Sequence, residues 1–159
     1  MIVYHGTTME IQKPDIKHSK AHLDFGIGFF TTTFSKQAER WAYRKGMRLS
    51  KPAIVNVYEI RDMSGYRVKK FEDTDREWLH FVVDCRNGED IYKDYDVVIG
   101  NVANDDVFKC VNMYMDRVWD EERTLKEISY FKKNDQIAFL TQEIIDGVVV
   151  FQESYEVKL

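Results

Sequence analysis

The chain has 159 residues, a length typical of one domain, and its hydrophobic fraction of 44% is enough for a full-sized core. The net charge of -4 argues against a broad nucleic-acid-binding surface, which needs a basic excess, but it is compatible with a local basic patch. No stretch approaches the roughly 20 apolar residues that span a bilayer, and the N-terminal residues show no signal-peptide pattern. We therefore expect a single domain over residues 1–159, soluble and cytoplasmic, with no membrane partner.

The N-terminal residues predict a strand that ends in a turn. Residues 2–4 are apolar and typical of a strand, His5 lies at its end, and the chain turns at Gly6. A histidine at such a position can donate or accept a hydrogen bond and can carry a charge near neutral pH. Residues 9–23 contain Pro14 and mixed polar residues, which predict a loop.

The next segment predicts a glycine turn, a short strand and a helix. Residues 24–33 contain two glycines, two adjacent phenylalanines and three threonines. Glycine lets the backbone turn tightly or approach a ligand closely, and the aromatic and β-branched residues favour a strand. Such a segment can form one wall of a pocket for a flat ring, or it can be a plain turn. Ser35 is the predicted N-cap of the following helix, whose apolar face holds Ala38, Trp41 and Ala42.

The rest of the chain alternates between predicted strands and predicted helices. The strand predictions cover residues 53–60, 66–71, 95–100, 136–140 and 148–157. The predicted helix starts are capping boxes at Thr74–Glu77 and Thr124–Glu127, an aspartate cap at Asp105 or Asp106, and Thr141. Some neighbouring strands are too close in sequence for a helical crossover. The predicted fold class is therefore α+β, with mixed or mainly antiparallel sheets.

Histidine and cysteine spacing does not predict a metal site. Cys85 and Cys110 have no close spacing, so they form neither a zinc motif nor a disulfide framework, and we expect two reduced, partly buried thiols. His18 and His22 lie four residues apart, but neither a helical apolar face nor a carboxylate accompanies them. We expect no bound metal.

Three separated segments together resemble the ADP-ribosyltransferase superfamily, in its diphtheria-toxin-like and PARP-like branch. They are Tyr4–Thr7, then Gly26–Phe30 with the following Ser35–Ala38, and Asn134–Ile137. That branch has a histidine on its first core strand, a tyrosine after a glycine turn and a glutamate on a late strand. Nearly the full chain also resembles an uncharacterised bacterial family classed as a domain of unknown function. The matching features there are Asp24–Thr33, Gln37-Ala38, Trp78, Tyr95–Gly100, Val102–Asp105 and Gln136 onward.

The resemblance to ADP-ribosyltransferases implies a split-sheet fold that holds NAD+ in a cleft as a substrate. It implies that His5 binds the hydroxyls of the adenosine-side ribose and that the backbone of Gly6 holds the nicotinamide amide. Phe30 falls where the family tyrosine stacks on the nicotinamide ring, and Gln136 falls where the family has its catalytic glutamate. The other residues expected to contact NAD+ are Thr7, Gly28 and Thr31.

The two departures from the family pattern have different chemical consequences. Stacking on nicotinamide needs no phenol hydroxyl, so Phe30 can replace tyrosine. Cleavage of the nicotinamide–ribose bond develops oxocarbenium character, which a carboxylate stabilises. The amide of Gln136 can hold a ribose hydroxyl but supplies no negative charge, so it affects transfer more than binding.

Another side chain would then have to supply the carboxylate. The candidates are Asp105, Asp106, Asp135 and Glu143, and we rank Asp105 first because it lies in a polar loop that follows a strand. Each of them is also readily interpreted as a cap or a surface charge. Arg40 and Arg86 are candidates for binding a phosphate, with an exposed, water-facing charge as the simpler interpretation.

The sequence therefore predicts an NAD+-dependent ADP-ribosyltransferase, which transfers ADP-ribose to a macromolecule or hydrolyses NAD+. Protein is favoured over nucleic acid as the acceptor because of the net charge of -4. The alternative is a non-catalytic module on the same fold that binds NAD+, another ADP-ribose-containing ligand or a protein partner. Family analogy implies a bacterial toxin or phage-conflict effector as the setting. The oligomeric state stays open.

Overall fold

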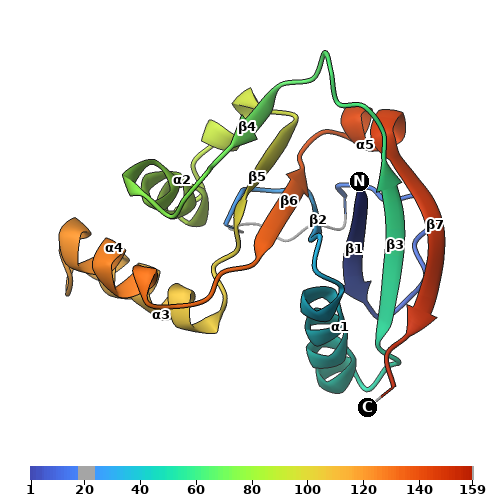
Figure 1. The fold of residues 1–159 in the computed structure, drawn as a ribbon, viewed down its shortest axis with the longest axis horizontal. Helices are drawn as coiled ribbons and strands as arrows, with labels where there is room; N and C mark the ends of the chain where they lie inside the picture. The colour runs from blue at the N-terminus through green and yellow to red at the C-terminus, as the bar shows by residue number, and fades with distance from the viewer. Residues whose placement is uncertain (18–23, 159) are drawn as a thin grey trace.

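The computed structural model describes residues 1–17 and 24–158, so the histidine pair at positions 18 and 22 lies outside the described residues. Two β-sheets with flanking helices make up this part of the chain (Figure 1). The strands are β1 (Ile2–Thr7), β2 (Phe29–Thr31), β3 (Ile54–Ile60), β4 (Val68–Lys70), β5 (Val97–Asn101), β6 (Asp135–Phe139) and β7 (Val149–Glu156). The helices are α1 (Ser35–Leu49), α2 (Arg76–Arg86), the 3₁₀ helix η1 (Ile91–Asp94), α3 (Asp105–Met115), α4 (Glu121–Ser129) and α5 (Gln142–Val148).

The two sheets differ in composition and meet at one bridge within the described residues. The first sheet has the order β1-β3-β7 and is antiparallel, while the second has the order β2-β6-β5-β4 and contains one parallel pair, β4 with β5. Tyr4 and Thr32 join them, each donating its backbone N–H to the carbonyl of the other at 2.8 and 3.0 Å. This architecture confirms the predicted α+β class with mixed and antiparallel sheets.

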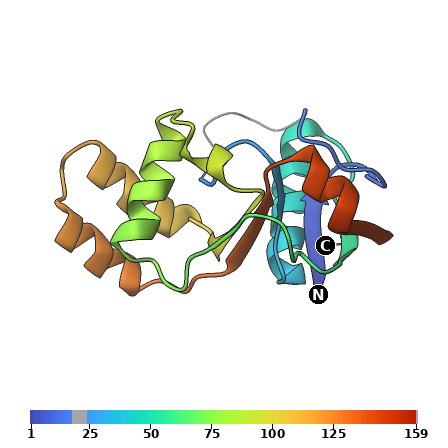
Figure 2. The ribbon, with the colours of Figure 1, turned by 90° about the horizontal axis from the view of Figure 1, so that it is seen from above.

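Apolar side chains fill the space between the sheets and the space behind the second sheet. One cluster lies between the sheets and under α5, and includes Val3, Phe29, Tyr58, Phe139 and Ile144. A second cluster packs the other face of the second sheet against α2, α3 and α4, with fully buried Trp78 at its centre. Seen from above, these three helices gather at one end of the molecule, and α1 and α5 lie beside the first sheet at the other end (Figure 2).

The strand predictions match the observed strands within a few residues, but most predicted helix caps are wrong. Asp75, Asn104 and Asp120 are the N-caps of α2, α3 and α4, and their side chains accept backbone N–H groups in the first turn. Ser35 is the first residue of α1, whose N-cap position is occupied by Phe34 without a side-chain cap. Thr141 caps α5 as predicted. Each error displaces the start by one to four residues, because several capping-type side chains lie close together at these helix starts.

Gly6 allows α1 to lie directly on β1. A Cβ atom on Gly6 would overlap the Ala38 carbonyl oxygen and would lie 2.8 Å from the Ala42 nitrogen. Both alanines are fully buried, so the contact is between backbones with almost no side chain between them. The helix that follows β2 is therefore held against β1 at the residue after His5.

We expect Gly6→Ala to lower the free energy of unfolding by about 3 kcal/mol, because rigid backbone atoms of α1 occupy the position of the new methyl group. Gly147→Ala is the matched control. There the new methyl group meets the Tyr66 hydroxyl at the far end of a flexible side chain, and the expected loss is about 1 kcal/mol or less. Urea unfolding followed by circular dichroism measures both values, and equal losses would contradict the assigned helix–strand contact.

Candidate functional site

The backbone of Phe30 fixes the tautomer of His5. The His5 Nδ1 atom lies 2.6 Å from the Phe30 carbonyl oxygen. A carbonyl oxygen only accepts hydrogen bonds, so Nδ1 carries the proton and donates, which leaves the Nε2 atom of a neutral imidazole as an acceptor. The ring also packs on Phe29, with ring centroids 4.5 Å apart. The imidazole is therefore held in one orientation by one hydrogen bond and one ring contact.

The surroundings of His5 keep it neutral. Burial, which disfavours the charged imidazolium, lowers the pKa of His5 to about 4. The hydrogen bond to Phe30 opposes this shift, and the nearby Lys45 ammonium adds to it. The acceptor character of Nε2 therefore persists across the physiological pH range.

Phe30 and Gln136 lie on the same face of the second sheet. Phe30 pairs with Ala138 across β2 and β6, and Gln136 is two residues from Ala138, so all three side chains point to the same side. Gln136 is 5% exposed, and its Nε2 atom is buried without a hydrogen-bond partner among the described residues. An unpaired buried amide donor is uncommon in a folded protein and is a position where a ligand oxygen would be stabilised.

The backbone groups of Gly6 point away from β3. Tyr4 uses its N–H and its carbonyl to pair with Thr32 of the second sheet. Backbone groups alternate in direction along a strand, so those of Gly6 point to the same side as those of Tyr4. The bridge between the sheets involves Tyr4 and not Gly6, and the two sheets separate beyond it.

Asp135 holds the end of β2 in place. Its carboxylate accepts the Thr32 hydroxyl at 2.8 Å, the Thr33 N–H at 2.9 Å and the Thr33 hydroxyl at 2.5 Å. The neighbouring Thr31 hydroxyl donates to the Ile137 carbonyl at 3.0 Å. The hydroxyls of these threonines are thus committed to bonds within the protein, and the Asp135 carboxylate joins β6 to the start of α1.

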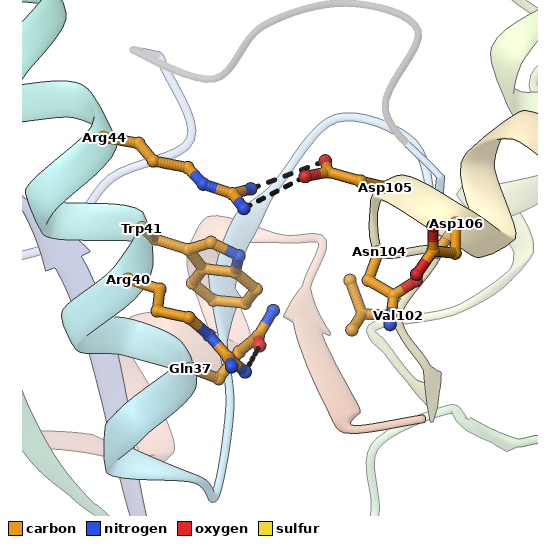
Figure 3. Close-up of a pocket in the computed structure, with 9 residues that line it drawn as sticks. Gln37, Arg40, Trp41, Arg44, Val102, Asn104, Asp105 and Asp106 are labelled. Atoms are coloured by element: carbon orange, nitrogen blue, oxygen red, sulfur yellow. Dashed lines mark hydrogen bonds and ion pairs between the residues drawn. The ribbon is translucent and has the colours of Figure 1, made fainter. Parts of the chain in front are cut away.

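A cavity of about 250 Å³ lies between α1 and the loop that joins β5 to α3 (Figure 3). The Trp41 indole projects from α1 into this space and is half-buried. Gln37 lies at one end, where its Oε1 accepts the Arg40 guanidinium at 2.7 Å and the Asn134 amide at 3.0 Å. The lining residues are Gln37, Arg40, Trp41, Arg44, Val102, Ala103, Asn104, Asp105 and Asp106.

Asp105 and Arg44 join the two sides of this cavity. The Arg44 Nη2 atom lies 3.0 Å from Asp105 Oδ2, and Nη1 lies 3.4 Å from Oδ1 (Figure 3). Both side chains are more than half exposed, at 61% and 72%. Asp105, which the sequence ranked first as a source of a carboxylate, therefore lies in the cavity wall with its charge paired to an arginine of α1.

The structure brings some of the predicted site residues together and separates others. His5 contacts the Phe30 backbone, and Gln136 lies on the adjoining strand, but the cavity lining does not include these three residues. Thr7 is buried and its hydroxyl accepts the Lys45 ammonium at 3.1 Å. A Cβ atom on Gly28 would lie 2.5 Å from the Phe139 carbonyl, so this glycine allows close strand packing.

Two other charged residues that the sequence singled out have structural partners. Arg86 is 12% exposed and pairs with Asp24 at 2.5 Å, so interpreting it as an exposed charge is wrong. Its guanidinium also lies 3.9 Å from the centroid of the Phe108 ring. Burial raises the pKa of Asp24, and the Arg86 charge and the Ala103 N–H oppose that shift. Glu143 lies in the first turn of α5, and its charge acts on Arg67 rather than on the cavity.

Sequence reasoning missed the contribution of one face of α1. The helical spacing of Ala38, Trp41 and Ala42 places them on one apolar face, but only the two alanines are fully buried. Gln37, Trp41 and Arg44 are spaced by four and three residues and form the cavity-facing side. That spacing is visible in the sequence, but it does not show which element lies opposite.

The two cysteines are not among the residues that line the cavity. Cys85 and Cys110 are free and buried, as expected, and burial raises the pKa of Cys85 to about 12. Among the described residues, no group of three histidine, cysteine or acidic side chains is arranged to hold a metal ion. In the same part of the chain, every helix is too short or too polar to cross a bilayer.

A protein-family model matches most of the chain. The family model described as "Protein of unknown function (DUF3990)" matches residues 1–150. The chain belongs to this DUF3990 family. No curated protein and no solved structure matched it. The match confirms that the chain is a member of a family of unknown function, and the resemblance of this DUF3990 protein to ADP-ribosyltransferases stays a prediction.

The low pKa of His5 predicts how the stability of the protein depends on pH. The ordinary pKa of about 6.5 applies in the unfolded chain, so between pH 6.5 and 4 the unfolded state binds more protons than the folded state. The contribution of His5 to the free energy of unfolding is therefore complete above about pH 6.5 and is lost as the pH falls towards 4.

Urea unfolding of the wild type, His5→Gln and Gln152→Ala at several pH values measures this effect. We expect His5→Gln to have a smaller acid loss between pH 6.5 and 4 than the wild type. Gln152, an exposed residue of β7 without a titratable group, is the control, and its replacement is expected to leave the wild-type slope. A wild-type slope in His5→Gln would contradict a neutral His5.

Proposed function

We propose that this protein binds NAD+ and breaks its nicotinamide–ribose bond, passing ADP-ribose to a macromolecule or to water. The observation that carries the proposal is the 2.6 Å hydrogen bond from His5 to the Phe30 carbonyl. It joins two of the three residues that resemble the ADP-ribosyltransferase pattern, although they lie 25 positions apart. The third, Gln136, lies on the strand paired with Phe30 and presents its side chain on the same face.

The chemical properties of these groups suit a ribose and a nicotinamide. The Nε2 lone pair of neutral His5 accepts a hydrogen bond, as recognition of a ribose hydroxyl requires. The Phe30 ring is half-buried and packs in part against the apolar cluster behind the second sheet, and its remaining surface is aromatic, as stacking on a pyridine ring requires. The outward-pointing N–H and carbonyl of Gly6 match the acceptor and the donor of a carboxamide.

Gln136 provides a test of whether NAD+ fits. Its buried Nε2 atom has no partner among the described residues, and a ribose hydroxyl oxygen would satisfy this donor. The cavity beside Trp41, at about 250 Å³, is smaller than the roughly 300 to 1,000 Å³ typical of ligand sites. It is therefore too small for a whole dinucleotide, and the proposed NAD+ contacts are those of His5, Gly6, Phe30 and Gln136.

The reaction that NAD+ supplies is the loss of nicotinamide with the bonding electron pair, which leaves an oxocarbenium-like ribose. His5 and Gln136 would orient the ribose hydroxyls. Neither supplies a negative charge, because His5 is neutral and Gln136 is an amide. The nearby carboxylates of Asp105 and Asp135 are engaged by Arg44 and by Thr32 and Thr33. We therefore expect slow turnover in the wild-type protein.

Gln136→Glu is expected to increase the rate of nicotinamide release by about 10- to 100-fold, since a carboxylate at this position stabilises the developing positive charge. Incubation of the purified variants with NAD+ and chromatography of released nicotinamide measures this rate. Gln152→Glu, an equivalent change at an exposed position of β7, is the control and is expected to match the wild type. No release from the wild type or from Gln136→Glu would rule out catalysis.

A second candidate function is NAD+ or ADP-ribose binding without catalysis, and the absence of a carboxylate at position 136 favours it. Isothermal titration calorimetry separates the two functions. Under both, we expect His5→Ala to weaken NAD+ binding by about five- to tenfold, equivalent to one lost hydrogen bond. Binding without nicotinamide release would establish the binding module. If NAD+ and ADP-ribose both fail to bind the wild type, both proposals are wrong, and a protein-interaction role is left.

A further inference from the structure

Helix α1 and the two residues after it are strongly basic in an otherwise acidic protein. Residues 35–51 hold six of the 23 basic residues and one of the 27 acidic residues, so this segment has a net charge of +5 in a chain whose total is -4. The rest of the chain is correspondingly acidic. A basic excess confined to one element is the electrostatic footprint expected of a surface that binds a polyanion.

Three of these basic residues form a stripe along one side of α1. Arg40, Arg44 and Arg48 follow at intervals of four residues, so they lie one above the other on the helix. Arg40 and Arg44 line the cavity, and Arg48 extends the stripe one turn beyond it. All three are exposed. The rise of 1.5 Å per residue puts successive arginines about 6 Å apart, close to the spacing of phosphates along a single strand.

The carboxylates that face this stripe neutralise its positive charge only in part. Asp105 pairs with Arg44, and Asp106 follows in the first turn of α3. Arg40 bonds to the uncharged amide of Gln37. Within the described part of the chain, no carboxylate lies within ion-pair distance of Arg40 or Arg48. Glu39, the acidic residue of α1, is bonded to Tyr155 and Lys36.

An aromatic side chain lies beside the stripe. Trp41 projects into the cavity between Arg40 and Arg44 (Figure 3). Aromatic platforms next to arginines bind the bases of single-stranded nucleic acids, because every base has a flat face that can stack. A duplex keeps its bases stacked inside the helix, so a single strand is the form that can use Trp41.

We propose that the acceptor is a single-stranded nucleic acid, with its phosphates along Arg40, Arg44 and Arg48 and one base beside Trp41. The binding step stands on the arginine stripe alone, and the transfer step rests on the proposed function. In that step nicotinamide leaves with the bonding electron pair, an oxygen or nitrogen of the nucleic acid forms the new bond to the ribose, and its proton passes to solvent. The sequence favoured a protein acceptor from total charge, and the local charge of α1 reverses that preference.

Fluorescence anisotropy with labelled 12-nucleotide RNA and DNA of mixed sequence tests the binding step. We expect salt-dependent binding of at least one of them by the wild-type protein. Arg48→Gln should weaken it by about fivefold and lower the salt slope by about 0.7, the value for one phosphate of a single strand. Asp105→Asn should tighten binding, because it removes the carboxylate that offsets Arg44. Arg61→Gln, an exposed arginine outside the stripe, is the control and should leave binding unchanged.

Three results would overturn the inference. The first is that neither oligonucleotide shows salt-dependent binding. The second is that Arg48→Gln and Arg61→Gln weaken oligonucleotide binding equally. The third is that polyglutamate binds as tightly as the oligonucleotides, which would assign the stripe to an acidic protein. Nucleic-acid binding without nicotinamide release would leave the binding site established while removing the proposed catalysis. Labelled oligonucleotide recovered with ADP-ribose attached would support both.

Discussion

The junction between the two sheets is the constraint on which the site depends. The Tyr4–Thr32 bridge and the adjacent bond from His5 to Phe30 hold β1 and β2 side by side for a few residues. Beyond that point β1 stays with the first sheet and β2 with the second. Because α1 begins directly after β2 and lies against Gly6, the junction also sets the position of the helix that carries Trp41 and the arginine stripe.

Much of the fold could be predicted from the sequence, because strands and helices bury apolar residues at different periods. The predicted strand at 53–60 corresponds to the observed Ile54–Ile60, and the predicted strand at 136–140 corresponds to Asp135–Phe139. The caps were less predictable. Thr74 and Asp75 are both good capping residues, and only the backbone conformation at the helix start decides that Asp75 caps α2. Local sequence does not fix that conformation.

The candidate site was predictable in part. The order of three motifs along the sequence predicted His5, Phe30 and Gln136 as site residues. In the structure His5 contacts the Phe30 backbone, and Gln136 lies on β6, the strand that pairs with the strand of Phe30. The orientation of α1 could not be read from the sequence, since Trp41 fits a buried apolar face as well as a cavity wall. Nor does the sequence show that Asp105 meets Arg44, 61 residues earlier, because that contact depends on the packing of the two sheets.

The exposure of the Arg44–Asp105 pair has a consequence for access to the cavity. An ion pair this open to water contributes at most about 1 kcal/mol, so at least about one molecule in six has it broken at equilibrium. The contact between α1 and the first turn of α3 at this side of the cavity is therefore a weak one. A ligand that competes for either charge shifts this equilibrium at little cost, and raised salt concentration favours the broken pair through Debye screening.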